Sequence, residues 1–315
     1  MFEFRRHPDS EKNESRGMRT EGETIVAAVQ MNTIQHERWG ESLHLENGTY
    51  EVIVPLTFGI RIMHFSLCGQ ENMLFEDREG AIRQEGEAFH TLGSDGWLLR
   101  GGHRLWASPE AYPRTYTPDD RPIEYVQTES GVRLIAPVEP WTQCAKEIEL
   151  IFQQDDVVVI HRIANKGAWP IQLAPWAITV MAPGGTAVVP QITRDTGLLP
   201  NRSISLWPYA AMNDERVTWG ERHIEVKQVA HLKQAFKFGM LQEEGKASYT
   251  RNGIVFEKRY ETISGASYPD GGCSFELYTN EHILELESLG PLVTLEPEAV
   301  ATHQEVWSLA PIKDV

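Results

Sequence analysis

Two short stretches of the sequence combine residue types that can perform acid–base chemistry. The first is GGHRLWASPE at 101–110, where two glycines permit a close backbone approach. In an extended strand His103 points to one face, whereas Arg104 and Trp106 point to the other. An arginine beside a tryptophan can donate hydrogen bonds to the hydroxyls of a polar ring that stacks on the indole. Glu110 adds a carboxylate to this stretch. The alternative is that Arg104 pairs with a structural carboxylate and Trp106 belongs to the core.

The second stretch is YPDGGCSFELYTNEHILELESLGPL at 268–292. Glu285 and Glu287 are two residues apart on a predicted strand, so both project from one face, about 7 Å apart. Alternation with Leu284, Leu286 and Ser288 marks the opposite face as core. Burial of either carboxylate would raise its pKa toward acid–base use. The two glutamates are therefore expected to face a cavity, or else solvent as on an ordinary strand.

The nine tryptophans of the chain are the third feature. Several lie beside Pro or Gly in predicted loops, as in EPWTQ, GAWP, APWA and LWP. Loop tryptophans at the mouth of a sandwich suit a carbohydrate, because the C–H face of a sugar stacks on an aromatic ring. Each tryptophan is also a candidate core residue.

Composition and missing motifs exclude several classes of function. The 29 basic and 45 acidic residues among 315 give a net charge of −16, which disfavours a nucleic-acid partner. The sequence contains no P-loop, no GxGxxG after a strand, no GxSxG and no HExxH. The three cysteines show no zinc-ligand spacing. We predict no metal and no cofactor.

The N-terminal segment and the apolar runs indicate where the protein resides. Residues 1–24 mix both charges with few large apolar groups, which predicts a flexible or loosely docked tail. This segment has no apolar region typical of a secretory signal, and no apolar run elsewhere is long enough to span a bilayer. We therefore predict a cytoplasmic protein with no membrane partner.

The local pattern from Thr24 onward is β almost everywhere. Strands are predicted at 49–59, 61–67, 145–153, 156–165, 253–261, 273–280 and 282–289, separated by turn residues such as Asn-Gly. Only 226–235 shows a weak helical period. So many short strands predict an all-β protein, with 25–315 forming a single domain of packed antiparallel sheets whose edges would allow a homodimer.

Three segments resemble the galactose mutarotase-like superfamily, within it an aldose 1-epimerase-like branch. They are GGHRLWASPE, HRIANKGAWPIQLAPWAITVMAPGG at 161–185 and LELESLGPLVTLEPEAVATHQEVWSL at 284–309. The resemblance covers roughly residues 37–310. It implies a large antiparallel β-supersandwich with an open cleft that binds sugars.

The resemblance also implies roles for single residues. Interconversion of anomers needs a base for the anomeric hydroxyl and an acid for the ring oxygen. Glu287 matches the family's base best, with Glu285 as the alternative if the register differs by one pleat. Trp176 stands where the family has its histidine acid, and tryptophan cannot donate a proton to the ring oxygen. His103 is then the candidate acid, and Lys237 in FKFG is a second one.

Three functions follow as hypotheses. In a mutarotase-like isomerase, Arg104 holds ring hydroxyls, Trp106 and Trp176 stack on the sugar, and His103 must face Glu287 across one cleft. A second hypothesis is a non-catalytic carbohydrate-binding protein on the same fold. A third is a glycoside hydrolase or polysaccharide lyase, which would use carboxylates about 5–10 Å apart. In each case the expected partner is a small-molecule sugar or an oligosaccharide, and Glu110, Lys237 and Glu285 are further substrate-binding candidates.

Overall fold

The computed structural model describes residues 29–312, so the predicted tail at 1–24 lies outside the described residues. Within this range the chain is built from β-strands and loops, with a short α-helix, α1 (Glu87–His90), and a 3₁₀-helix, η1 (Arg114–Tyr116). Neighbouring strands in the large sheets run antiparallel. The predicted all-β antiparallel sandwich is confirmed.

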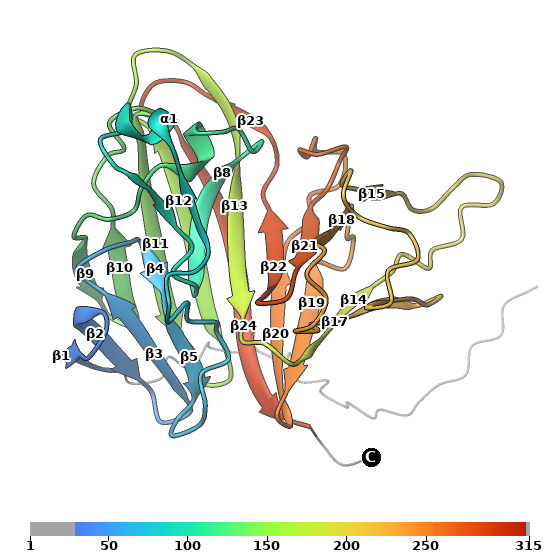
Figure 1. The fold of residues 1–315 in the computed structure, drawn as a ribbon, viewed down its shortest axis with the longest axis horizontal. Helices are drawn as coiled ribbons and strands as arrows, with labels where there is room; N and C mark the ends of the chain where they lie inside the picture. The colour runs from blue at the N-terminus through green and yellow to red at the C-terminus, as the bar shows by residue number, and fades with distance from the viewer. Residues whose placement is uncertain (1–28, 313–315) are drawn as a thin grey trace, which may run out of the picture.

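The strands form two large sheets and two small ones (Figure 1). The ten-stranded sheet contains, in spatial order, β16 (Val217–Trp219), β17 (His223–Lys227), β14 (Thr186–Pro190), β19 (Lys246–Arg251), β20 (Ile254–Tyr260), β24 (Val300–Pro311), β12 (Val157–Asn165), β11 (Cys144–Phe152), β10 (Gly131–Ile135) and β9 (Glu124–Thr128). The eight-stranded sheet contains β15 (Ile204–Leu206), β18 (Phe236–Met240), β21 (Phe275–Thr279), β22 (Leu284–Leu289), β13 (Ile171–Met181), β8 (His103–Ser108) and β4 (Arg61–Ile62), with β23 (Val293–Leu295) paired to β13. The small sheets contain β1 (Gln30–His36), β2 (Gly40–Glu46), β3 (Tyr50–Pro55) and β5 (His64–Leu67), and β6 (Arg83–Glu85) with β7 (Gly96–Leu98).

The strand pattern read from the sequence matches the observed elements. Each of the seven predicted segments contains a strand, and β11 shows strict alternation of buried and half-buried residues, as expected for a strand with one face on the core. The Asn252–Gly253 turn between β19 and β20 has positive φ at both residues (48° and 76°), which is the conformation that Asn-Gly favours. The weak helical prediction at 226–235 is wrong, because β17 ends at Lys227 and a loop follows.

The main core contains the inward-facing apolar side chains of both large sheets. From the eight-stranded sheet it includes Leu284 and Leu286 of β22, and from the ten-stranded sheet Trp307 and Leu309 of β24. The outward face of β22 and β13 is buried as well, because the segment at 75–99, which contains α1, β6 and β7, contributes a second apolar cluster against it. Side chains on this outward face are therefore enclosed rather than exposed to solvent.

Candidate functional site

The outer face of the eight-stranded sheet carries a pocket of about 340 Å³, which we call the outer pocket. Seven of the eight predicted site residues line it, namely Arg104, Trp106, Glu110, Trp176, Lys237, Glu285 and Glu287. Strands β8, β13, β22, β21 and β18, which lie side by side in the sheet, supply most of its floor. The sheet thus brings together residues that are up to 183 positions apart in the sequence, from Arg104 to Glu287.

The strand register explains why these particular side chains meet. Ile178 of β13 lies opposite Arg104 of β8 on one side and opposite Glu287 of β22 on the other. Glu287 in turn lies opposite Glu276 of β21. Directly opposed residues project from the same face of a sheet, so this row lies on the outer face, where Arg104, Ile178 and Glu287 line the outer pocket.

Two glycines fix the start of β8. Both have positive φ, 100° at Gly101 and 68° at Gly102. A β-carbon on Gly101 would collide with the carbonyl of Phe75, and one on Gly102 with the carbonyl of Ile62. Glycine is therefore required for the close approach of β8 to its neighbours, and this approach sets the position of Arg104 two residues further on.

Glu287 occupies the floor of the outer pocket and is 1% exposed. One of its carboxylate oxygens, Oε2, accepts hydrogen bonds from the Trp176 indole Nε1 (2.9 Å) and from the Lys237 ammonium (2.9 Å). The other oxygen, Oε1, is buried and has no hydrogen-bond partner among the described residues. The hydrogen-bonding capacity of this second oxygen is therefore unused in the described structure.

Lys237 of β18 lies between two carboxylates. Its Nζ is 2.7 Å from Glu276 and 2.9 Å from Glu287, and it lies over the rings of Trp176 (4.8 Å to the centroid) and Trp207 (4.6 Å). Burial alone would lower the pKa of this ammonium, but the two carboxylates raise it above its ordinary value. Lys237 therefore stays charged and is a weak proton donor at neutral pH.

Arg104 and Glu285 form the second buried ion pair of the outer pocket. Nη1 of Arg104 donates to Oε1 of Glu285 at 3.0 Å, and the guanidinium lies 4.4 Å from the centroid of the Trp106 ring. Nε of Arg104 has no hydrogen-bond partner among the described residues. Burial raises the pKa of Glu285, against the opposing effect of Arg104.

Aromatic side chains form the walls of the outer pocket. Trp97 of β7 lies 5.2 Å from Trp106, and Trp106 lies 5.5 Å from Trp176, measured between ring centroids. Tyr116 packs on Trp106 at 5.0 Å and donates its hydroxyl hydrogen bond to Glu110 at the rim. Nε1 of Trp97 is buried without a hydrogen-bond partner in the described part of the chain.

Several of these residues were not selected from the sequence. Trp97 and Trp207 were noted only as members of the tryptophan set, and Tyr116, Tyr209, Tyr278 and Glu276 were not considered. Glu276 lies on a predicted strand, but its approach to Lys237 depends on the pairing of β18 with β21, which no local pattern indicates.

The prediction that His103 faces Glu287 across the cleft is wrong. The side chain of His103 is fully buried on the opposite face of the eight-stranded sheet, where Nδ1 lies 2.9 Å from the Thr179 hydroxyl and Nε2 lies 2.7 Å from Nε2 of His161. The physical reason is the period of the strand, since residues adjacent to Arg104 must point away from the face that Arg104 occupies. His103 therefore cannot act as the acid on a ligand in the outer pocket.

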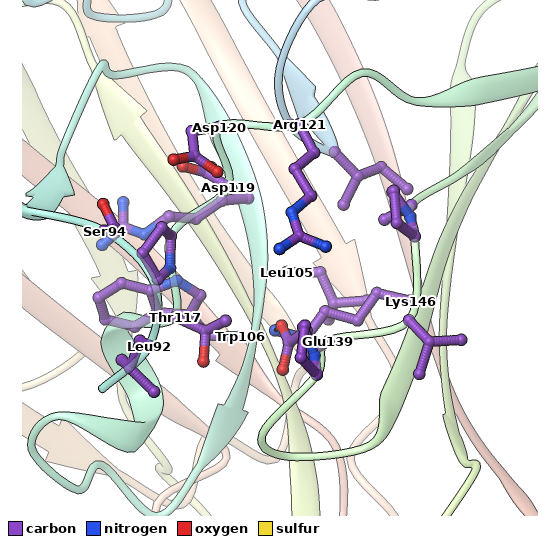
Figure 2. Close-up of a pocket in the computed structure, with 18 of the residues that line it drawn as sticks. Leu92, Ser94, Leu105, Trp106, Thr117, Asp119, Asp120, Arg121, Glu139 and Lys146 are labelled. Carbon is purple, nitrogen blue, oxygen red and sulfur yellow. Dashed lines mark ion pairs between the residues drawn. The ribbon is translucent and has the colours of Figure 1, made fainter. Parts of the chain in front are cut away.

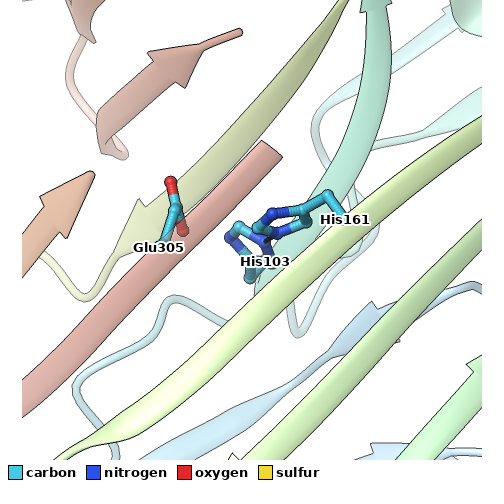
Figure 3. Close-up of side chains that lie close together, drawn as sticks. All are labelled: His103, His161 and Glu305. Atoms are coloured by element: carbon cyan, nitrogen blue, oxygen red, sulfur yellow. Dashed lines mark hydrogen bonds between the residues drawn. The ribbon is translucent and has the colours of Figure 1, made fainter. Parts of the chain in front are cut away.

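His103 belongs to a group that we call the inner polar cluster. Its members lie between the two large sheets and comprise His103, His161, Lys258, Ser288, His303 and Glu305. Figure 3 shows His103 and His161 with their rings side by side and Glu305 on the neighbouring strand. Burial lowers the pKa of His161 to about 4 and that of His303 to about 3.

Three members of the inner polar cluster offer ligand atoms that a metal ion could use. Atoms of His103, His161 and Glu305 lie within 4.8 Å of one another. However, the Lys258 ammonium is 2.7 Å from Glu305, and a divalent cation beside it would be repelled in this low-dielectric interior. The two histidine nitrogens are also close enough to share a hydrogen bond directly. These residues fit a structural hydrogen-bond network better than a metal centre.

A second pocket of about 320 Å³ adjoins the other side of Trp106. It is bounded by the loops around 92–94, 117–121 and 136–140, and the guanidinium of Arg121 faces into it (Figure 2). Lys146 and Glu139 form an ion pair in its wall. Of the predicted site residues, only Arg104 and Trp106 contribute to this second pocket.

Comparison with known proteins identifies the fold. No family model and no curated protein matches the chain. A solved galactose mutarotase-like protein from Lactobacillus casei matches with a TM-score of 0.54 and 10% identity, covering 89% of this chain and 100% of the other. One from Clostridium acetobutylicum matches with a TM-score of 0.53 and 8% identity, covering 91% and 99%. The Slr1438 protein from Synechocystis sp. matches with a TM-score of 0.53 and 13% identity, covering 93% and 100%.

These matches, together with the two large antiparallel sheets, give the chain the galactose mutarotase-like fold. The resemblance noted in the sequence is confirmed at this level. At such low identity the likeness concerns the fold, and function has to be argued from the pocket itself. Across residues 29–312 no helix has the length and apolar character needed to cross a membrane.

Proposed function

We propose that the outer pocket binds a sugar. The observation that carries this proposal is a set of three buried polar atoms without hydrogen-bond partners among the described residues, on side chains that line the pocket: the acceptor Glu287 Oε1 and the donors Arg104 Nε and Trp97 Nε1. A buried polar group without a partner costs about 1–3 kcal/mol. A ligand that both donates and accepts hydrogen bonds removes this cost.

A sugar ring has the matching chemistry. Its hydroxyls donate to a carboxylate and accept from a guanidinium or an indole, and its C–H faces stack on aromatic rings such as Trp106 and Trp176. The volume of about 340 Å³ lies at the small end of the range for small-molecule sites. A monosaccharide, or the terminal residue of an oligosaccharide, is the expected ligand.

Binding is tested by saturation-transfer NMR with a panel of hexoses, pentoses and short oligosaccharides. We expect at least one sugar to bind, and Trp106→Ala to abolish its signal because the stacking surface is removed. Trp141→Ala is the matched control, since Trp141 is 57% exposed and does not line the outer pocket. Failure of every sugar in the panel to bind would contradict the proposal.

Catalysis at the anomeric centre is a second candidate, favoured by the free Glu287 oxygen. In this reaction Glu287 removes the proton of the anomeric hydroxyl, the carbonyl forms as the bond between the anomeric carbon and the ring oxygen breaks, and Lys237 protonates the ring oxygen. Lys237 takes the role predicted for His103, although its raised pKa makes it a weak acid.

Proton NMR of freshly dissolved α-sugars distinguishes a catalyst from a binding protein. General acid–base catalysis contributes typically 10²–10⁴-fold to a rate, so an enzyme would accelerate anomer equilibration clearly. We expect Glu287→Gln to remove any such acceleration. Binding without acceleration would assign the pocket to a non-catalytic carbohydrate-binding protein.

A further inference from the structure

The outer pocket is lined by two cations, and each of them is already engaged by a buried carboxylate. Arg104 pairs with Glu285 at 3.0 Å, and both side chains are less than one-tenth exposed. Lys237 pairs with Glu276 at 2.7 Å as well as with Glu287. Each of the two cationic side chains that line this pocket therefore has an acidic partner in the described structure.

The carboxylates outnumber the cations around the outer pocket. Glu110, Glu285 and Glu287 line it, and Glu276 lies directly behind Lys237 with no other ion-pair partner among the described residues. An anionic ligand would have to compete with a carboxylate for each cation in a buried setting. Displacing one partner of such a pair leaves an uncompensated buried charge, which is costly.

We propose that Glu285 and Glu276 determine the charge specificity of the outer pocket: by occupying Arg104 and Lys237, they make it select uncharged sugars over phosphorylated or uronic sugars. The inference rests on the proposed sugar-binding function and adds the residues that set its selectivity. Glu276 acts without touching the ligand, because it lies behind Lys237 and does not line the pocket. Discrimination through an unfavourable contact is a common source of binding specificity.

The two carboxylates act on different parts of the pocket. Glu285 accepts a hydrogen bond from Nη1 of Arg104, whose guanidinium lies over the Trp106 ring, and its negative charge offsets the positive charge of that guanidinium. A guanidinium without this carboxylate beside it would carry an uncompensated positive charge, which favours the oxygens of a phosphate or a carboxylate. Removing the Glu285 charge should therefore convert a hydroxyl site into an anion site.

The test compares matched sugars in calorimetric titrations at pH 7.5. The probes are D-glucose and D-galactose, their 6-phosphates, and D-glucuronate and D-galacturonate. For the full chain we expect the uncharged hexose that binds to do so at least tenfold more tightly than its anionic counterparts. In Glu285→Gln, and separately in Glu276→Gln, we expect this ratio to fall at least fivefold, mainly through tighter binding of the anion.

Glu149→Gln is the control, because Glu149 pairs with Arg162 on the ten-stranded sheet and does not line the outer pocket. It should leave the ratio unchanged. Equal affinity of the wild-type chain for a hexose and its 6-phosphate would overturn this inference while leaving the proposed function intact. An unchanged ratio in both folded variants would also overturn it. Binding of no sugar, charged or uncharged, would instead refute the proposed function.

Discussion

Strands β8 and β22 carry buried polar side chains on both faces, and the two faces differ in one respect. In the inner polar cluster the hydrogen-bond network is closed: Ser288 bonds both His303 and Glu305, and Lys258 donates to a backbone carbonyl at 3.1 Å besides its ion pair. No buried nitrogen or oxygen of this cluster lacks a partner within the described structure. In the outer pocket, Glu287, Arg104 and Trp97 each have an unpaired buried atom.

We interpret this difference between the inner polar cluster and the outer pocket as a difference in role, with the first stabilising the fold and the second binding a ligand. Both faces contain buried ion pairs, so burial and charge alone would not identify the site. A closed network gains nothing from a ligand and positions the strands, whereas an open one keeps donors and acceptors for a molecule that enters.

Substitution of Lys258 by Met should cause the largest loss of stability. It would leave Glu305 buried without its cation, and breaking a buried pair from one side costs about 3–5 kcal/mol. Urea unfolding followed by tryptophan fluorescence measures the change.

The double variant Lys258→Met/Glu305→Gln should recover part of this loss, because the uncompensated charge is removed. Lys166→Met is the matched control, since the exposed Lys166–Glu298 pair should contribute no more than about 1 kcal/mol. A free energy of unfolding for Lys258→Met within about 1 kcal/mol of wild type would show that the inner pair does not stabilise the fold.

Acid should destabilise the protein through the inner histidines. The pKa of His161 is lowered to about 4 and that of His303 to about 3, chiefly by burial, whereas an unfolded histidine titrates near 6.5. Their contribution to stability is therefore complete above about pH 6.5 and is lost as the pH falls toward their folded pKa values. Between pH 6.5 and 5 we expect a loss on the order of 2–4 kcal/mol.

This loss is measured by urea unfolding at several pH values, with the imidazole signals followed by NMR. Histidines that are neutral in the folded state should show no titration shift above pH 5. A free energy of unfolding that stays constant from pH 7 to 5 would contradict this account of the inner polar cluster.

Glu287→Gln should affect binding more than folding. Lys237 keeps Glu276 as its ionic partner, so we expect stability to change by no more than about 1–1.5 kcal/mol. The affinity for the bound sugar should fall at least tenfold, because a hydrogen bond to a charged acceptor is lost. Parallel titration and unfolding experiments check both. A large loss of stability with unchanged affinity would place Glu287 with the structural residues.

Strand alternation allowed much of the site to be predicted, and it also explains the main error. The spacing of Glu285 and Glu287, and of Arg104 and Trp106, correctly indicated which side chains share a face. By the same period His103 lies on the other face, so it could not serve a ligand held by Arg104. The alternation, applied consistently to all of β8, excludes His103 as the acid from the sequence alone.

The remaining features depend on which strands become neighbours. The approach of Lys237 to Glu276 and Glu287 requires β18 to pair with β21 and β21 with β22, in a defined register. The cover supplied by Trp97 requires the segment at 75–99 to fold over the sheet. These are contacts between distant segments, and alternation within one strand carries no information about them.

Glu285 allows the ionised and the protonated form of one ion pair to be compared, because its charge should change with pH. Burial raises its pKa, so this carboxylate takes up a proton at a higher pH than an exposed glutamate, although Arg104 opposes the shift. Lowering the pH should therefore release Arg104 and improve the binding of an anionic sugar relative to an uncharged one. We expect a change of about threefold between pH 8 and 5.5, equivalent to less than 1 kcal/mol.

A uronic sugar is the suitable probe, since its carboxylate stays ionised over this range while a phosphate ester changes charge near pH 6. The ratio of its affinity to that of the parent hexose should rise as the pH falls in the wild-type chain and stay constant in Glu285→Gln. Lys237, Glu287 and Tyr278 face the same carboxylate and are unchanged in this variant, so a slope that persists would assign the pH dependence to one of them. A ratio that falls with pH would contradict the ion-pair explanation, because protonation of Glu285 can only increase the positive charge that Arg104 offers to the ligand.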